Sequence, residues 1–218
     1  MKDYDFTPSK VNQQDIWRSV QVFSEREEDY PAMEKILKAR GFSLKDVGGY
    51  DLFPAGTDKG PGVGLPLFSL SGICGYQRYH PDKKERYKTH GKRGIAKAMA
   101  YTPHLIICEG MFDCFTLYKA LHSSRSRVSV CCLVGNQLTD EQLNYLLSIS
   151  FKHTTFYIAL DNDRSSDTMK MFKQIAPYRK VGVVTPSRTY GKDWDDAFRN
   201  YPAESLDWWR MNLGARNG

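Results

Sequence analysis

The chain has 218 residues, enough for one large domain or two small ones. Its net charge of +6 is a mild basic bias, which suits a polyanionic partner. The sequence contains no apolar run of about 18 residues and starts with charged and polar residues, so neither a membrane helix nor a signal peptide is expected. Its 5 cysteines include no Cys-x-x-Cys pair and are best explained as buried thiols in a reducing cytoplasm, without disulfides or zinc.

The first 100 residues are predicted to form a small basic subdomain of mixed α+β structure. Helices are expected over residues 14–23 and 30–42, the second with Pro31 at its start and Gly41 at its end, and a short helical turn follows over 42–47. Between residues 51 and 79, glycine and proline separate short β-prone runs. This pattern predicts a small antiparallel sheet with a hairpin turn at Ser71 and Gly72.

The segment from His80 to Lys97 is basic, and its two glycines, Gly91 and Gly94, predict a loop. Tyrosines are interleaved with its basic residues. Because Lys and Arg neutralise phosphates and aromatic rings stack on unpaired bases, this segment is a candidate for binding nucleic acid. A solvated basic loop without a partner is the alternative. The candidate residues are Arg78, Arg86, Lys88, Lys92 and Arg93.

Strands and helices alternate beyond residue 100. Strands are expected over 104–108, 128–134, 155–160 and 181–185, with helices over 112–122, 139–149 and 166–175 between them. Such alternation predicts a four-stranded parallel sheet flanked by helices, an α/β fold with right-handed crossovers. Further helices are expected over 193–199 and 205–211, the last packing through Trp208 and Trp209. The predicted domains are therefore 1–100 and 101–200, followed by a packing helix and tail over 201–218.

Acidic residues follow three of these predicted strands. Glu109 follows the first strand, Asp161 and Asp163 follow the third, and Asp193 and Asp195 come soon after the fourth. The carboxyl ends of parallel strands meet at one edge of a sheet, where open α/β sheets bind ligands. Crowded carboxylates are unfavourable without a cation, and hard oxygen ligands suit Mg²⁺ or Mn²⁺. Any one of these acids alone is equally well explained as a loop residue, but together they predict a metal site.

Two residues near Glu109 are candidates for a supporting role. Gly110 leaves the backbone free to turn sharply and lets a phosphate come close. Asp113 lies one helical turn beyond Glu109. It either braces the site from the helix or only decorates the helix's first turn, where acids suit the dipole.

Residues from about 103 to 200 resemble the TOPRIM domain, the catalytic fold shared by DnaG-type primases, topoisomerases and some nucleases. The matching motifs are Glu109-Gly-x-x-Asp113, Asp161-x-Asp163-Arg164 and Lys192-Asp193-x-Asp195. The segment from Val130 to Thr139, which contains Gly135, is similar to the primase branch. So, more loosely, are Ala39-Arg-Gly-Phe, Leu65-Pro-Leu-Phe and Gly75-Tyr-Gln-Arg78 upstream. One departure is Ser165-Ser166, where primases usually carry Ala-Gly.

The resemblance implies a primase-like enzyme that makes short RNA primers on single-stranded DNA from ribonucleoside triphosphates. Mg²⁺ or Mn²⁺ would assist nucleotidyl transfer in the replication of a phage, plasmid or other mobile element in a bacterial cytoplasm. The family's zinc-binding and helicase domains are not recognisable, so a separate helicase or replication initiator is expected as a partner. A TOPRIM nuclease and a non-catalytic accessory protein that binds nucleic acid are the alternatives.

The resemblance also assigns roles to residues. Glu109, Asp161 and Asp163 are the implied catalytic residues. The implied metal ligands are Glu109, Asp161, Asp163, Asp193 and Asp195. Arg164 and Lys192 join the basic residues listed above as contacts to nucleic acid or nucleotide, and Gly110, Asp113 and Gly135 support the site.

Overall fold

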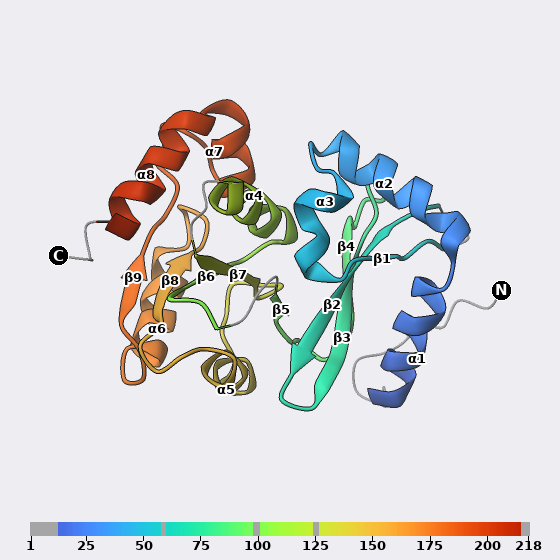
Figure 1. Cartoon of the computed structure of the whole chain (residues 1–218), viewed down its shortest axis with the longest axis horizontal. Coiled ribbons are helices and arrows are strands. Elements are labelled where there is room, and N and C mark those ends of the chain that lie inside the picture. Colours follow the sequence, from blue (N-terminus) through green and yellow to red (C-terminus); the bar gives the residue numbers. More distant parts are fainter. Residues whose placement is uncertain (1–12, 58–59, 98–100, 124–126, 215–218) are drawn as a thin grey trace. The chain divides into compact units, whose positions relative to one another are not determined.

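The chain divides after Ala98 into two units, Met1–Ala98 and Met99–Gly218, in a computed structural model (Figure 1). The structure describes residues 13–57, 60–97, 101–123 and 127–214. Among the described residues, every helix is too short or too polar to cross a membrane.

The first unit begins with helices at the predicted places. These are α1 (Gln13–Ser24), the 3-10 turn η1 (Glu27–Asp29), α2 (Tyr30–Ala39), α3 (Leu44–Val47) and the 3-10 turn η2 (Gly48–Tyr50). Pro31 lies in the first turn of α2, where its missing N–H leaves no helical bond unmade. Ser43 and Asp46 form a reciprocal capping box at the start of α3.

A four-stranded antiparallel sheet follows the helices. Its strands are β1 (Phe53–Pro54), β2 (Val63–Ser69), β3 (Gly72–Tyr79) and β4 (Tyr87–Gly91), in that spatial order, and a short strand β5 (Ala96–Lys97) comes next in the chain. The predicted hairpin is present, but its turn lies at Leu70 and Ser71 because Ser69 pairs with Gly72. Gly72 begins β3 with a φ of 99°, a conformation that favours glycine.

Strand β4 corrects the prediction of a loop from His80 to Lys97. It pairs with β3 along its whole length, and the ring of His90 stacks on that of Tyr76 at 4.7 Å. Gly91, which was expected to lie in a loop, is the last residue of β4. A Cβ on Gly91 would lie 2.6 Å from the carbonyl oxygen of Cys74 and 3.0 Å from the Cα of Gly75, so glycine allows the two strands to approach.

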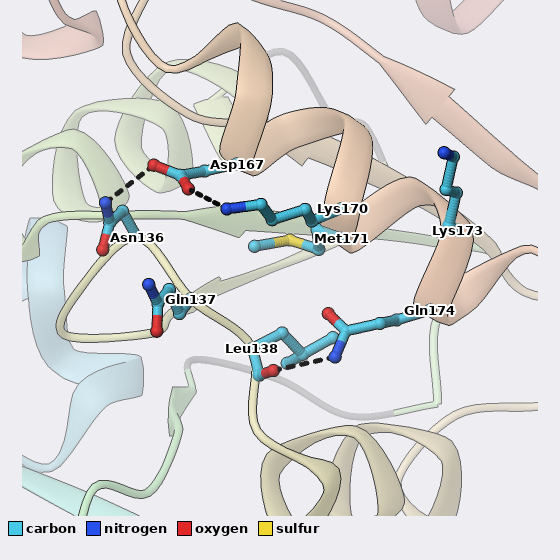
Figure 2. Close-up of a pocket in the computed structure, with 8 residues that line it drawn as sticks. All are labelled: Asn136, Gln137, Leu138, Asp167, Lys170, Met171, Lys173 and Gln174. Carbon is cyan, nitrogen blue, oxygen red and sulfur yellow. Dashed lines mark hydrogen bonds and ion pairs between the residues drawn. The ribbon is translucent and has the colours of Figure 1, made fainter.

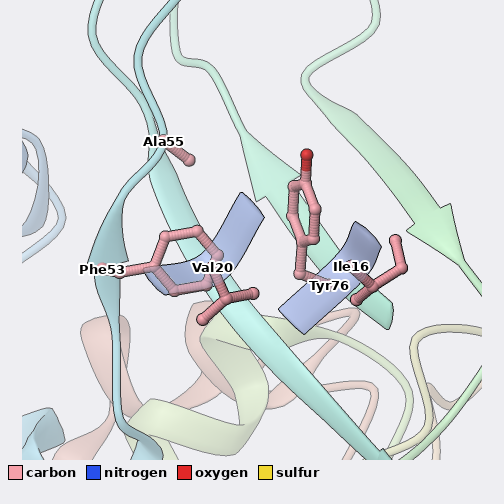
Figure 3. Packing of buried hydrophobic residues seen from close by; sticks show 5 residues of the cluster. All are labelled: Ile16, Val20, Phe53, Ala55 and Tyr76. Atoms are coloured by element: carbon pink, nitrogen blue, oxygen red, sulfur yellow. The ribbon is translucent and has the colours of Figure 1, made fainter. Parts of the chain in front are cut away.

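Helix α1 packs on this sheet through a small apolar core. Ile16 and Val20 of α1 meet Phe53, Ala55 and Tyr76, all of them buried (Figure 3). The rings of Phe53 and Tyr76 meet edge to face with 5.6 Å between their centroids. This core holds the basic strands β3 and β4 against a helix.

The second unit has the predicted α/β fold. Its strands are β6 (His104–Cys108), β7 (Val128–Cys132), β8 (Thr155–Ala159) and β9 (Val181–Val183). They lie in the order β7-β6-β8-β9, and each neighbouring pair is parallel. The helices are α4 (Met111–Ser123), α5 (Asp140–Ser148), α6 (Ser165–Ile175), α7 (Trp194–Asn200) and α8 (Pro202–Gly214).

The strand order decides which face each helix covers. Strand β7 lies on one side of β6, whereas β8 and β9 lie on the other. Right-handed crossovers therefore place α4 on one face of the sheet and α5 and α6 on the opposite face. Helix α7 packs against both α4 and α8, so these three helices form one layer (Figure 1).

Two tryptophans anchor that layer. Trp194 and Trp209 are fully buried, with ring centroids 5.0 Å apart, and Trp209 also meets Tyr157 of β8. The predicted packing role holds for Trp209, but Trp208 is 37% exposed. Five cysteines, Cys74, Cys108, Cys114, Cys131 and Cys132, are buried free thiols.

Candidate active site

Glu109 follows β6 directly and is tied to the end of β7. Its backbone carbonyl accepts hydrogen bonds from the N–H of Gly135 at 3.3 Å and from the thiol of Cys132 at 3.4 Å. Gly135 has a φ of 147°, a conformation open mainly to glycine. The sharp turn after β7 therefore fixes the backbone of Glu109 at the carboxyl edge of the sheet.

Gly110 and Asp113 are packed against each other at the start of α4. A Cβ on Gly110 would lie 2.8 Å from the Oδ2 of Asp113. The chain bends at Glu109 and Gly110, although Gly110 does not adopt a left-handed φ. Its small size leaves room for the Asp113 carboxylate.

The loop after β8 is bonded to the segment that precedes α7. Asn162, between Asp161 and Asp163, donates its side-chain N–H to the carbonyl of Gly191 at 2.8 Å, and its backbone N–H to that of Lys192 at 3.3 Å. These bonds hold two of the predicted acidic motifs side by side.

Asp193 and Asp195 already have structural partners. Asp193 is the N-cap of α7 and accepts a hydrogen bond from the N–H of Asp196 at 2.8 Å. Asp195 accepts a hydrogen bond from Thr116 at 3.1 Å and pairs with Arg199 at 2.6 Å. Its backbone N–H donates to the carboxylate of Asp113 at 3.0 Å. The carboxylates of Asp193 and Asp195 therefore stabilise the first turn of α7 and its contact with α4.

Acids from the three motifs influence the pKa values of one another. Burial, together with the charges of Glu109 and Asp193, raises the pKa of Asp161 to about 6. Burial also raises the pKa of Glu109, against the opposing charge of Arg164. Burial and the charge of Asp193 raise the pKa of Asp113 to about 8. Each of these carboxylates therefore disfavours the ionisation of its neighbours.

Two cations of the predicted set offset this repulsion. The Nε of Arg164 lies 3.4 Å from the Oε2 of Glu109 and 3.6 Å from the Oδ1 of Asp163. The charge of Lys192 lowers the pKa of both Glu109 and Asp161. Both cations therefore lie where negative charge accumulates.

The donor set fits a hard divalent cation. The Oε2 of Glu109 is buried and accepts no hydrogen bond, and the neighbouring donors are carboxylate oxygens, which Mg²⁺ and Mn²⁺ prefer. As the side chains stand in the described part of the chain, no three His, Cys, Asp or Glu residues are arranged to hold a metal. The chemistry of these donors thus suits a divalent cation.

Asp167 is a charged residue of the site that none of the motifs contains. Its charge raises the pKa of Glu109, and its carboxylate accepts a hydrogen bond from Asn136 at 2.8 Å and pairs with Lys170 at 3.7 Å. The available signal was its position in the first turn of the helix that follows Asp161-x-Asp163-Arg164.

Asp167 also lines a hollow of about 520 Å³ between the loop after β7 and helix α6 (Figure 2). Three amide side chains and two lysines surround it, and Leu138 and Met171 add apolar surface. The lining residues are Asn136, Gln137, Leu138, Asp167, Lys170, Met171, Lys173 and Gln174. This mixture of amides, cations and apolar surface suits a polar organic ligand.

The predicted basic residues lie in the first unit. Arg78 of β3 stands opposite Lys88 of β4 in the sheet register, so both side chains are on one face. Arg78 is half-buried, whereas Arg86, Lys88, Lys92 and Arg93 are exposed. The first unit thus presents basic side chains along β4 and the turns on either side of it.

Comparisons with known proteins agree with this description. Residues 106–198 match the family model described as Toprim-like. The fold is similar to that of the primase fragment of the bacteriophage T7 primase-helicase protein, with a TM-score of 0.55 and 17% sequence identity over 78% of this chain and 72% of that one. No curated protein matches the sequence. TOPRIM domains generally bind Mg²⁺, in keeping with the oxygen donors described above. Residues 106–198 of this chain therefore form a TOPRIM domain, which resembles the core of a phage primase.

Proposed function

We propose that the protein is a primase-like nucleotidyltransferase that makes short RNA primers on single-stranded DNA. The observation that carries the proposal is the group of mutually repelling carboxylates, Glu109 and Asp161 foremost, at the carboxyl edge of the sheet. A site that concentrates negative charge beside two cations is suited to binding Mg²⁺ together with the phosphates of a ribonucleoside triphosphate. The similarity in fold to a primase fragment supports this choice of substrate.

Each residue has a defined part in this proposal. Glu109, Asp161 and Asp163 would hold the divalent cation, with Asp193 and Asp195 as further ligands. When bound, the cation supplies positive charge for the triphosphate and for the charge that develops during transfer. Lys192 and Arg164 bind phosphate oxygens, and the raised pKa of Glu109 makes its carboxylate a stronger proton acceptor. Gly110, Asp113 and Gly135 keep these residues in place.

The first unit would bind the template. Arg78, Arg86, Lys88, Lys92 and Arg93 offer charge for a phosphate backbone, as expected for a protein that binds single strands. In the proposed role, a separate helicase or replication initiator supplies unwound DNA, and the setting is the replication of a phage, plasmid or other mobile element.

A TOPRIM nuclease is the second candidate, because the carboxylate group suits metal-dependent hydrolysis equally well. The two functions differ in their products. Incubation with single-stranded DNA, labelled ribonucleotides and Mg²⁺ is expected to give short labelled oligoribonucleotides while the template stays intact. A shortened template without labelled product would identify a nuclease instead.

Variants test whether the acids carry the activity. Glu109→Gln and Asp161→Asn are expected to lower primer synthesis by about 100-fold or more, because each removes a carboxylate that would hold the cation. Asp207→Asn, on the exposed face of α8, is the matched control and should keep normal activity. Normal synthesis by Glu109→Gln, or no product from the folded wild type with Mg²⁺ or Mn²⁺, would refute the proposal.

A further inference from the structure

The amino edge of the parallel sheet, opposite the acids, has a composition of its own. The described residues that lead into its strands are 101–103, 127, 149–154 and 176–180, and none of them is Asp or Glu. The Lys and Arg residues among them are Arg127, Lys152, Arg179 and Lys180. Each strand rises by about 3.3 Å per residue, so this edge lies roughly 15 Å from the carboxyl edge. It is therefore separate from the candidate active site.

Aromatic rings are exposed at this amino edge. Tyr101 is 58% exposed, Phe151 43% and Tyr178 57%. The rings of Tyr101 and Phe151 have centroids 5.3 Å apart, and His153 stacks on Phe151 at 5.4 Å with an interplanar angle of 7°. Three neighbouring rings thus form an exposed cluster with Lys152 between two of them in sequence.

Hydrogen bonds hold these connections together. The backbone N–H of Tyr101 donates to the carbonyl of Ile149 at 3.1 Å, and the hydroxyl of Thr154 donates to the carbonyl of Thr102 at 2.8 Å. Arg179 donates to the carbonyl of Leu147 in the last turn of α5 at 3.2 Å and to the hydroxyl of Ser150 at 3.4 Å, and the second bond joins the connection before β9 to the one before β8. Hydrogen bonds therefore fix the connections that carry these rings to one another.

Helix dipoles explain only part of this arrangement. Helices α4, α5 and α6 all end at the amino edge, and cations there complement their carbonyl ends. Such complementarity gives no reason for exposed tyrosine and phenylalanine, whose apolar surface is unfavourable in water. Rings interleaved with cations are the combination that binds single-stranded nucleic acid, by stacking on bases and neutralising phosphates.

We propose that the amino edge of the parallel sheet is a second binding surface for single-stranded nucleic acid, on which bases stack against Tyr101, Phe151 and Tyr178. The cations of the same connections neutralise the backbone. The surface does not depend on the proposed chemistry, because it lies apart from the acids and needs no metal.

The test measures the affinity of the full chain for a fluorescent oligodeoxythymidylate by anisotropy over a range of salt concentrations. The Glu109→Gln background is used so that no turnover occurs and binding is judged apart from catalysis. Phe151→Leu with Tyr178→Leu is expected to weaken binding by about 5-fold or more, since stacking stabilises each base. Arg127→Ala with Lys152→Ala is expected to reduce the slope of log K against log salt concentration by about 0.7 for each phosphate contact that is lost.

Matched changes in the first unit serve as controls. Trp17→Leu removes an equally exposed ring, and Lys35→Ala with Lys38→Ala removes two exposed cations. The proposal would be overturned if the amino-edge variants bound the oligonucleotide as tightly as the controls do. That result would also be expected if this edge bound an acidic protein and not nucleic acid. Crosslinking the protein with an unaltered amino edge to an oligonucleotide that contains iodouracil is an independent measurement. Crosslinks are expected at Tyr101, Phe151 or Tyr178, and crosslinks found only elsewhere would also overturn it.

Discussion

The carboxylate of Asp113 accepts a hydrogen bond from the backbone N–H of Asp195 at 3.0 Å, joining the first turn of α4 to the first turn of α7. This contact spans 82 residues of sequence and links two of the three acidic motifs. Asp113 thus has a structural role in addition to its place in the motif. Because burial and nearby acids disfavour its charged form, this role does not require ionisation.

Replacing Asp113 with Asn is expected to stabilise the protein at alkaline pH. The pKa of Asp113 rises from 3.8 to about 8 in the folded protein, so the folded chain holds a proton that the unfolded chain releases. Its contribution to stability is full below about pH 4 and is lost as the pH rises towards 8. Asn keeps an acceptor for the Asp195 N–H and cannot ionise, so the gain should be on the order of a few kcal/mol at pH 8 and small at pH 4.

Urea unfolding with a metal chelator at both pH values measures this difference. Asp207→Asn on the surface of α8 is the control, for which no comparable pH dependence is expected. A gain for Asp113→Asn that is equal at pH 4 and pH 8 would contradict the assignment of a raised pKa.

The guanidinium of Arg164 lies between Glu109 and Asp163, and its removal should make the site more dependent on Mg²⁺. Arg164→Ala leaves Glu109 and its neighbours without this charge, at a cost of about 0.5–1 kcal/mol because Arg164 is partly exposed. Mg²⁺ should then raise the melting temperature of the variant by about 2 °C or more beyond the rise in the wild type. Calorimetry with and without Mg²⁺ measures both shifts.

Arg210→Ala removes an ion pair of α8 and provides the comparison, because Arg210 pairs with Asp207, an exposed residue of the same helix. Its response to Mg²⁺ should match that of the wild type. An Arg164→Ala variant that responds to Mg²⁺ no more than the wild type would show that the guanidinium does not compensate these acids.

Sequence patterns predicted the second unit better than the first, for a physical reason. Strand β6 is a short apolar run that ends at Glu109 and Gly110, and a strand buried on both faces needs such a run. Strand β4 contains Lys88 and His90 and is extended because it pairs with β3. This pairing cannot be predicted from the local sequence pattern.

The same distinction applies to the site. Glu109, Asp161 and Asp163 follow predicted strands, so topology alone brings them to one edge. The pairing of Asp167 with Asn136 joins residues 31 positions apart through side chains, and its geometry depends on how α6 packs. Likewise, the φ of 147° at Gly135 reflects a turn that only the folded chain defines.

Gly191 precedes the motif that begins at Lys192, and replacing it with alanine should displace that motif. A Cβ on Gly191 would lie 2.7 Å from the backbone nitrogen of Ala197 and 3.1 Å from its Cα, neither of which can rotate away. We expect a loss of about 1–3 kcal/mol in the free energy of unfolding and reduced primer synthesis. Gly48→Ala is the control, since a Cβ there meets no atom within 4 Å. Equal stability of the two variants in urea would contradict the predicted clash.

Trp194 links α7 to the sheet, and its replacement by Phe should loosen the helix that carries Asp195. Its indole N–H donates to the carbonyl of Ala159 at 3.2 Å in a buried setting, and its ring packs on Trp209. Phe fills less volume and leaves that carbonyl without this donor, so we expect a loss of about 2–4 kcal/mol in urea unfolding.

Trp208→Phe is the matched control because Trp208 lies one position before Trp209 and is 37% exposed. Its cost should stay within about 0.5 kcal/mol. If Trp194 fixes α7, Trp194→Phe should also weaken the Mg²⁺-dependent rise in melting temperature, because Asp193 and Asp195 begin that helix. A Trp194→Phe variant that loses stability but keeps the full response to Mg²⁺ would show that the acids of α7 are positioned independently of its packing on the sheet.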